Sequence, residues 1–179
     1  MPPNSKDVFS AGNSIGIVFE DKVNFYDLDN TTWQERPDLV FDLPNNCKAV
    51  FSPLHYRYIN VIIENKIIFY IFDEDEGVWK KYPINELEIP INCQGVFADE
   101  WGSIFVIADN KIKIFAIDDS DEWSEYTELE FDLPGNFNGA IYQRFLGIVN
   151  DNKINYYFNQ YQNSWIEISN AAFNFNIMD

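Results

Sequence analysis

Four tryptophans recur at nearly regular spacing and are the residues best suited to bind a ligand. They stand 46, 44 and 42 residues apart. An indole face can stack on a sugar ring or on a cation, and weak sites gain avidity when the same site is repeated. Packing of each indole between neighbouring repeats is the alternative, and the sequence leaves both open. The tryptophans are Trp33, Trp79, Trp123 and Trp165.

Acidic residues form a second repeated group, shortly before each of the first three tryptophans. Carboxylate oxygens bind calcium, which takes roughly six to eight oxygen ligands. No loop has the full alternating-acid pattern of a calcium loop, and the fourth repeat has Asn159 and Tyr161 at the matching positions. We therefore expect solvated hairpin loops and no metal. The aspartate pairs are Asp27 and Asp29, Asp73 and Asp75, and Asp119 and Asp121.

Other reactive residues are sparse. His55 is the only histidine, and it lacks a cysteine or carboxylate at metal-ligand spacing. Cys47 and Cys93 hold the same place in two repeats, either as a bridge or as free thiols. Phosphate-binding glycine loops, nucleophile elbows and paired metal-binding histidines are absent. We expect neither an enzyme nor a cofactor.

The elements that position these residues follow the same repeat. A lysine opens an alternating apolar segment in each copy, and a proline closes the first three copies, with Asn176 in the fourth. A period of roughly 40–50 residues is typical of propellers and solenoids. The lysines are Lys22, Lys66, Lys111 and Lys153, and the prolines are Pro44, Pro90 and Pro134.

The third repeat shows the expected order of strands within one unit. Residues 95–98 and 103–108 are short apolar segments, and residues 111–117 alternate with the period of two that indicates a strand. Between the last two, Asp109 and Asn110 predict a tight turn, because Asp and Asn tolerate positive φ. A more polar fourth strand is expected after Trp123.

These patterns predict an all-β fold, a closed four-bladed β-propeller with four antiparallel strands per blade and little or no helix. The whole chain, 1–179, is expected to form a single propeller. Four units fit it without remainder, and the end repeats resemble the middle ones, which favours a ring over an open solenoid. The expected blades are approximately 6–46, 47–92, 93–136 and 137–179.

The repeats resemble the hemopexin-like four-bladed propeller family. The similar segments are the strand-one motifs at 48–51, 94–97 and 138–141 and the Asp-Leu-Pro endings at 42–44 and 132–134. The resemblance implies a non-enzymatic module that binds a small molecule or glycan at the tunnel mouth or between blades. The family has an acidic residue where this chain has Lys6, Lys48, Gln94 and Asn138. The resemblance therefore does not carry over a tunnel cation or haem site, and whether the tunnel holds an ion is left open. The hairpin, loop and tryptophan order is also similar to small propeller lectins.

The charge of the chain excludes one class of partner. With 29 acidic and 12 basic residues, the formal net charge is −17, which repels phosphate backbones. We therefore expect no nucleic-acid partner.

The N-terminal residues do not have the pattern of a secretory signal, no apolar run is long enough for a transmembrane helix, and the compartment is left open. The rival function is a structural or self-assembling protein, of a storage or crystalloid type, and a homo-oligomer is left open.

Overall fold

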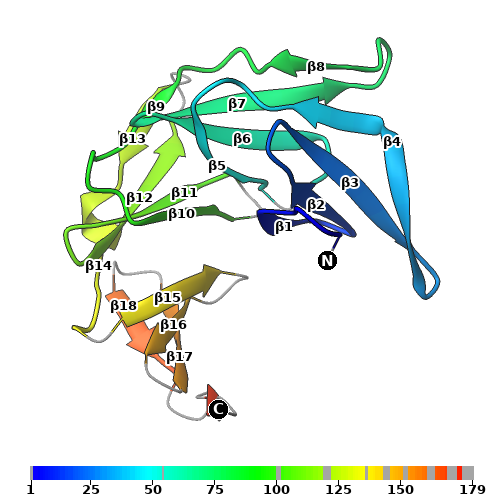
Figure 1. Cartoon of the computed structure of the whole chain (residues 1–179). Helices are drawn as coiled ribbons and strands as arrows, with labels where there is room; N and C mark the ends of the chain where they lie inside the picture. The colour runs from blue at the N-terminus through cyan, green and yellow to red at the C-terminus, as the bar shows by residue number, and fades with distance from the viewer. Residues whose placement is uncertain are drawn as a thin grey trace. The chain divides into compact units, whose positions relative to one another are not determined.

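In the computed structural model, the chain forms four antiparallel β-sheets that follow one another in sequence (Figure 1). In every sheet the first four strands are neighbours in chain order, which is the arrangement of a propeller blade. The predicted all-β fold of four blades is confirmed. The structure describes residues 2–53, 55–99, 102–118, 122–135, 137–142, 146–150, 153–160, 164–168 and 173–174.

The first two blades differ in how their outer strand is built. Blade 1 consists of β1 (Asp7–Ala11), β2 (Ser14–Val18), β3 (Lys22–Asp29) and β4 (Thr32–Asp42). Blade 2 consists of β5 (Cys47–Phe51), β6 (Tyr58–Ile63), β7 (Lys66–Asp73), β8 (Val78–Lys81) and β9 (Leu87–Glu88). Both β8 and β9 pair with β7, whereas β4 of blade 1 is one continuous strand.

The last two blades repeat the order of blade 2. Blade 3 consists of β10 (Gly95–Ala98), β11 (Ile104–Ala108), β12 (Lys111–Ile117), β13 (Trp123–Glu125) and β14 (Phe131–Asp132). Blade 4 consists of β15 (Phe137–Tyr142), β16 (Leu146–Asn150), β17 (Lys153–Gln160), β18 (Ser164–Glu167) and β19 (Phe173–Asn174). The described residues contain one short 3-10 helix, Thr127–Leu129, and no helix long and apolar enough to span a membrane.

The turn between β11 and β12 forms as its residues predict. Asp109 and Asn110 both have positive φ, 54° and 59°. Two consecutive residues with positive φ give a turn whose twist matches that of the flanking strands. Glu64, two residues before the lysine that opens β7, has a φ of 55° without being Asn, Asp or Gly. The residue two positions before the strand-opening lysine is therefore left-handed in both blades.

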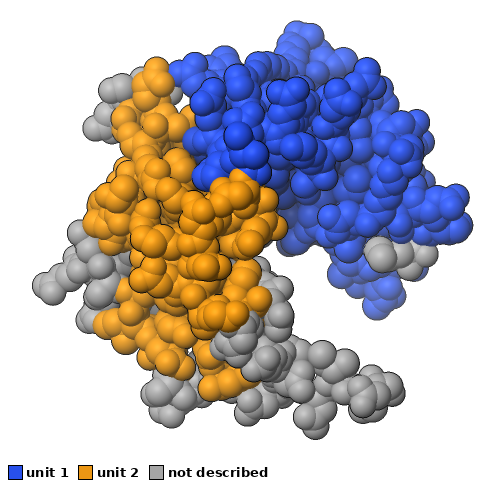
Figure 2. Space-filling model, turned by 60° about the vertical axis from the view of Figure 1, so that its left-hand side comes forward, with its two compact units in different colours: residues 1–91 blue, residues 92–179 orange. Residues whose placement is uncertain are grey.

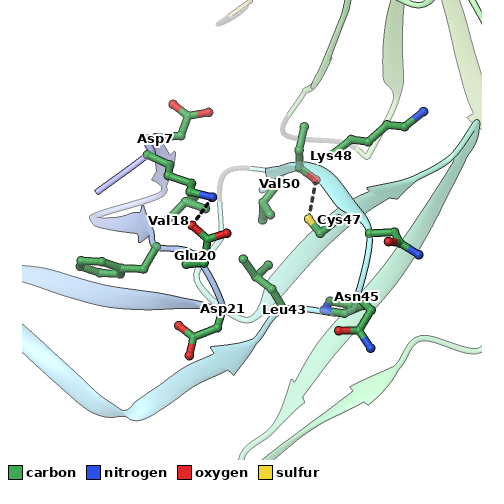
Figure 3. Close-up of a pocket in the computed structure, with 14 residues that line it drawn as sticks. Asp7, Val18, Glu20, Asp21, Leu43, Asn45, Cys47, Lys48 and Val50 are labelled. Atoms are coloured by element: carbon green, nitrogen blue, oxygen red, sulfur yellow. Dashed lines mark hydrogen bonds and ion pairs between the residues drawn. The ribbon is translucent and has the colours of Figure 1, made fainter. Parts of the chain in front are cut away.

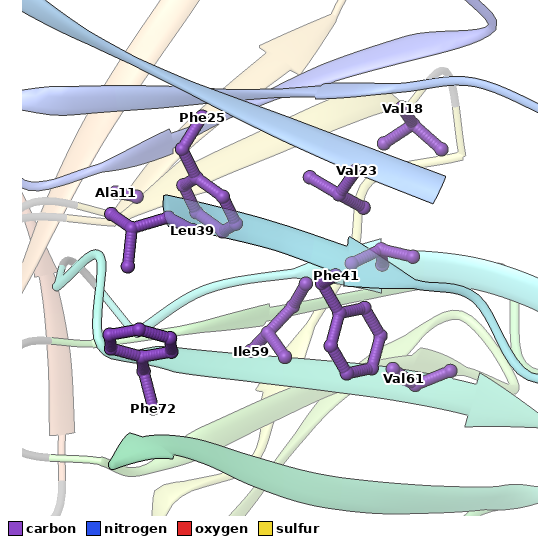
Figure 4. Packing of buried hydrophobic residues seen from close by; sticks show 10 residues of the cluster. Ala11, Val18, Val23, Phe25, Leu39, Phe41, Ile59, Val61 and Phe72 are labelled. Atoms are coloured by element: carbon purple, nitrogen blue, oxygen red, sulfur yellow. The ribbon is translucent and has the colours of Figure 1, made fainter. Parts of the chain in front are cut away.

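The chain divides into two compact units of two blades each, residues 1–91 and 92–179 (Figure 2). Closure into one ring, the single-domain assignment and the blade boundaries stay predictions. Unit 1 has an apolar core shared by its two blades (Figure 4). Phe25 and Leu39 of blade 1 are fully buried there, as are Ile59 and Val61 of blade 2. Unit 2 has a matching core, in which Ile112 and Ile148 are fully buried.

Candidate functional site

Trp79 is inserted between the two blades of unit 1. Its indole Nε1 donates a hydrogen bond of 3.3 Å to the main-chain carbonyl of Leu39 in β4. The ring stacks on Phe25 with centroids 5.7 Å apart, and it contacts the edges of Phe41 and Phe72. A buried indole normally finds an acceptor for its N–H, and here the acceptor belongs to the neighbouring blade. Trp79 thus links blade 2 to blade 1.

Trp165 has the same role in unit 2. Its Nε1 donates to the carbonyl of Leu129 at 2.8 Å, and its ring lies edge-on to Phe131 with centroids 5.8 Å apart. Leu39 and Leu129 each stand five residues before the proline that ends their blade. The acceptor position is therefore also part of the repeat, a signal that the sequence carried and that the tryptophan spacing alone did not reveal.

Trp33 and Trp123 lie in different surroundings. Trp33 on β4 is 47% exposed, and its cross-strand partner Leu28 is 51% exposed. Trp123 begins β13, pairs with Ile117 and is half-buried. In the described parts of each unit, the tryptophans are not brought together in one site. Each belongs to its own blade.

An opening of about 420 Å³ lies beside Trp79, between β4 and the β7–β8 hairpin. Three aromatic side chains line it, Phe41 from blade 1 and Tyr70 and Trp79 from blade 2. The rings of Phe41 and Tyr70 meet edge to face at 5.0 Å. Burial raises the pKa of the Tyr70 hydroxyl. We call this opening the Trp79 groove; its other lining residues are Val40, Asp42, Pro44, Gly77 and Val78.

A second opening of about 410 Å³ is also lined by Gly77 and contains a charged cluster. Arg36 donates two hydrogen bonds to Asp38, at 3.0 and 2.7 Å, and one to Asp27 at 2.7 Å. Its guanidinium lies 5.7 Å from the centroid of the Tyr56 ring. The hydrogen bonds from Arg36 lower the pKa of Asp38. Because two carboxylates already pair with the guanidinium, the cluster is a structural ion pair rather than a free anion site.

A third opening, of about 610 Å³, lies where the first strands of blades 1 and 2 begin (Figure 3). Val18, Leu43 and Val50 line its apolar part, and Lys6 and Lys48 stand at its rim. Lys6 pairs with Glu20, and Lys48 donates to the carbonyl of Glu64 at 2.7 Å. The remaining lining residues are Asp7, Phe19, Asp21, Pro44, Asn45, Asn46, Cys47 and Ala49.

The acidic loops use their carboxylates within the fold. Asp73 accepts hydrogen bonds from the main-chain N–H groups of Asp75 and Glu76 and pairs with Lys80 at 2.7 Å. Among the described residues, no group of three or more His, Cys, Asp or Glu side chains is placed to hold a metal ion. Asp119, Asp121 and Tyr161 lie outside the described residues, as does the side chain of Asn159.

His55 and the two cysteines make local contacts. The His55 ring stacks on Tyr56 at 4.7 Å, and its Nδ1 accepts a hydrogen bond from the N–H of Arg57. Cys47 and Cys93 are both free and half-buried, and each thiol donates to a carbonyl two residues later. Burial raises the pKa of both thiols. A raised pKa leaves less thiolate at neutral pH, so neither cysteine is an activated nucleophile.

Fold and site together define a propeller-type module of four antiparallel blades, with an aromatic groove between the blades of its first unit. No family model and no curated protein matches the sequence. The hemopexin-like assignment therefore stays a prediction. Solved structures do match, and at the identities found they show the fold alone.

Three similar structures illustrate this. A Lactobacillus plantarum protein has a TM-score of 0.54 and 11% identity, over 98% of this chain and 57% of that one. A functionally unknown protein from Desulfotomaculum acetoxidans has a TM-score of 0.55 and 13% identity, over 96% of this chain and 56% of that one. Hsv2p from Kluyveromyces lactis has a TM-score of 0.56 and 15% identity, over 85% of this chain and 45% of that one. This chain thus spans about half the length of the structures it matches.

The sequence led us to exclude an enzyme, and this prediction is wrong. Two further matches, from Bacteroides fragilis and Bacteroides uniformis, are described as candidate 6-phosphogluconolactonases, at 13% and 14% identity. Missing sequence motifs do not rule out catalysis, because a catalytic site can be assembled from residues without a recognisable spacing. With TM-scores of 0.48 and 0.49, these two matches assign no activity to this chain.

Proposed function

We propose that this chain is a binding module that holds a small molecule or glycan between blades, in the Trp79 groove of unit 1. The observation that carries the proposal is the convergence of Phe41, Tyr70 and Trp79 on one opening of about 420 Å³. Small-molecule sites typically have volumes of roughly 300–1,000 Å³ and are lined by aromatic and apolar side chains with few polar groups.

The chemistry of the groove suits a flat ligand with hydroxyl groups. The aromatic side chains supply faces and edges for the C–H groups of a sugar ring. Asp42 at the rim supplies a carboxylate that can accept hydrogen bonds from hydroxyls. Because Trp79 is fixed by its bond to Leu39 and by its neighbours Phe25 and Phe72, little entropy is lost when a ligand packs against it.

The test blocks the groove without disturbing the core. Val78 lines the groove and is 45% exposed, so Val78→Arg places a long side chain across the opening. Ile91→Arg is the matched control, because Ile91 is 93% exposed and does not line the groove. A glycan array followed by calorimetry should identify a ligand whose affinity falls at least tenfold in Val78→Arg and stays unchanged in Ile91→Arg. Absence of any ligand, or equal effects of both variants, would refute the proposal.

Trp33, Trp123 and Trp165 stay candidate ligand residues in the lectin-like form of this proposal, with several sites per chain. Calorimetry measures the number of ligands bound per chain. Several ligands per chain support the lectin-like form, whereas one ligand per chain that Val78→Arg abolishes supports a single site in the Trp79 groove. Self-assembly is the second candidate function. The specific observation in its favour is the exposed pair of Leu28 and Trp33.

A further inference from the structure

Leu28 and Trp33 form the blade 1 counterpart of a pair that is covered in blade 2. Leu28 stands six residues after Lys22 and pairs across the sheet with Trp33. Phe72 stands six residues after Lys66 and pairs with Trp79 in the same way. The two pairs therefore occupy the same register and the same face of their blades.

The environments of the two pairs are opposite. Phe72 is 6% exposed and Trp79 is half-buried, because both pack against blade 1. Within unit 1, no blade precedes blade 1, and Leu28 and Trp33 are about half exposed. The β3–β4 hairpin that carries them continues through five consecutive cross-strand pairs to a two-residue turn at Asn30 (Figure 1).

The repeat itself indicates what kind of surface would cover this pair. Trp79 and Trp165 each meet the outer-strand region of another blade, which supplies a carbonyl acceptor and aromatic side chains. The indole of Trp33 would need the same elements. A blade of this kind is therefore the fitting partner, in preference to a ligand of unrelated chemistry.

We propose that the Leu28–Trp33 pair docks against the outer strand of a blade in a second copy of this chain. The repeat itself favours this occupant. In unit 1 the equivalent pair, Phe72 and Trp79, packs against another blade of the same chain, and in unit 2 Trp165 likewise packs against blade 3.

The charge of the chain makes this association sensitive to salt. Each copy carries a formal charge of −17, so two copies repel each other at long range. Dissolved salt screens this repulsion, with a Debye length of about 10 Å at 0.1 M and about 3 Å at 1 M. Docking of an apolar pair should therefore become tighter as salt is added, the reverse of an interface held by ion pairs.

Light scattering on the whole chain tests the proposal, over a range of concentrations and at two salt levels. We expect a particle of twice the 21.0 kDa mass of one chain, with tighter pairing at high salt. Trp33→Glu and Leu28→Lys should each weaken pairing at least tenfold. Ile91→Glu is the control, because it adds the same charge at another exposed apolar residue of unit 1 and should leave pairing unchanged. Circular dichroism confirms that each variant is folded.

Three results would overturn the proposal. One is a single-chain particle at every concentration and salt level. Another is a dimer that Trp33→Glu leaves intact. The third is a monomer in which acrylamide fails to quench Trp33, measured in a variant whose other tryptophans are phenylalanine, because the chain's own blade would then cover the pair. Ligand binding in the Trp79 groove is measured separately with Val78→Arg, so failure of one proposal does not decide the other.

Discussion

Blades 1 and 2 carry the same tryptophan at the same place in the sheet and use it differently. In blade 2, Trp79 and Phe72 lie against the neighbouring blade, and the indole is hydrogen-bonded to Leu39. In blade 1, Trp33 and Leu28 are about half exposed. Strand register decides which residues share a face, but only a neighbouring blade decides whether that face is buried. A repeated residue is thus not by itself a repeated site.

The largest expected effect separates the two tryptophans by stability. Trp79→Ala removes a ring that packs against Phe25, Phe41 and Phe72, and we expect a loss of about 3 kcal/mol in the free energy of unfolding. Trp33→Ala, measured in dilute protein, should cost less than about 1 kcal/mol, because half of the ring is already in water. Urea denaturation followed by circular dichroism measures both. Equal losses would remove the distinction between the blades.

A smaller effect isolates the indole hydrogen bond. Trp→Phe keeps most of the packing and removes the N–H, which leaves a carbonyl without its partner. Trp79→Phe and Trp165→Phe should each cost about 1 kcal/mol or somewhat more, since smaller rings also pack less well. Trp33→Phe should change the free energy of unfolding by a few tenths of a kcal/mol at most. If Trp33→Phe costs as much as Trp79→Phe, the indole of Trp33 is bonded as well.

The ion-pair cluster on β4 gives an effect that depends on pH. Arg36 lowers the pKa of Asp38 below its ordinary value of 3.8 in the folded chain. The paired carboxylate therefore contributes stability above pH 3.8, and this contribution is lost as the pH falls through the lowered pKa. Since these side chains are partly exposed, Arg36→Gln should cost only about 0.5–1 kcal/mol at neutral pH.

Urea denaturation at neutral pH and at about pH 2 checks this expectation. The difference between wild type and Arg36→Gln should shrink in acid, because the ion pair contributes less as Asp38 becomes protonated. A difference that is the same at both pH values would mean that Arg36 acts through its packing against Tyr56 rather than through charge.

The smallest effect compares the two units through their cysteines. Burial raises the pKa of Cys47 and of Cys93, so each thiol holds less thiolate at pH 8 than a free cysteine does. Alkylation of Cys47→Ser and Cys93→Ser variants, which report one thiol each, should be several-fold slower than that of a small-molecule thiol. Rapid alkylation of either cysteine would show that its main-chain hydrogen bond and its burial are not maintained in solution.

Much of the fold could be predicted from the sequence. The third strand of blade 3 was expected at 111–117 and is Lys111–Ile117, because strict alternation fixes a strand that has neighbours on both sides. The turn at Asp109 and Asn110 was expected from residue type and is confirmed. The fourth strand was less predictable. In blade 2 it is split into β8 and β9, and polar outer strands carry a weak pattern.

The candidate site could be predicted only in part. Trp79 was expected to lie either at a ligand site or between blades, and it lies between blades and lines a groove. Phe41 and Tyr70 were not singled out, because they come from different blades. The equivalent residues of unit 2, Phe131 and Tyr157, make the same contact, so the repeat did carry a signal for this pair. The exposure of Trp33 could not be predicted either, since it depends on whether a neighbouring blade covers the residue and not on its own repeat.

Hydrogen exchange of the indole N–H groups of Trp33, Trp79 and Trp165, followed by NMR at several protein concentrations, tests the central claim most directly. Trp79 and Trp165 should be protected at every concentration, because their acceptors Leu39 and Leu129 belong to the same unit. Trp33 should exchange rapidly in dilute protein and become protected only as copies of the chain pair. Protection of Trp33 equal to that of Trp79 in the dilute monomer would contradict the account.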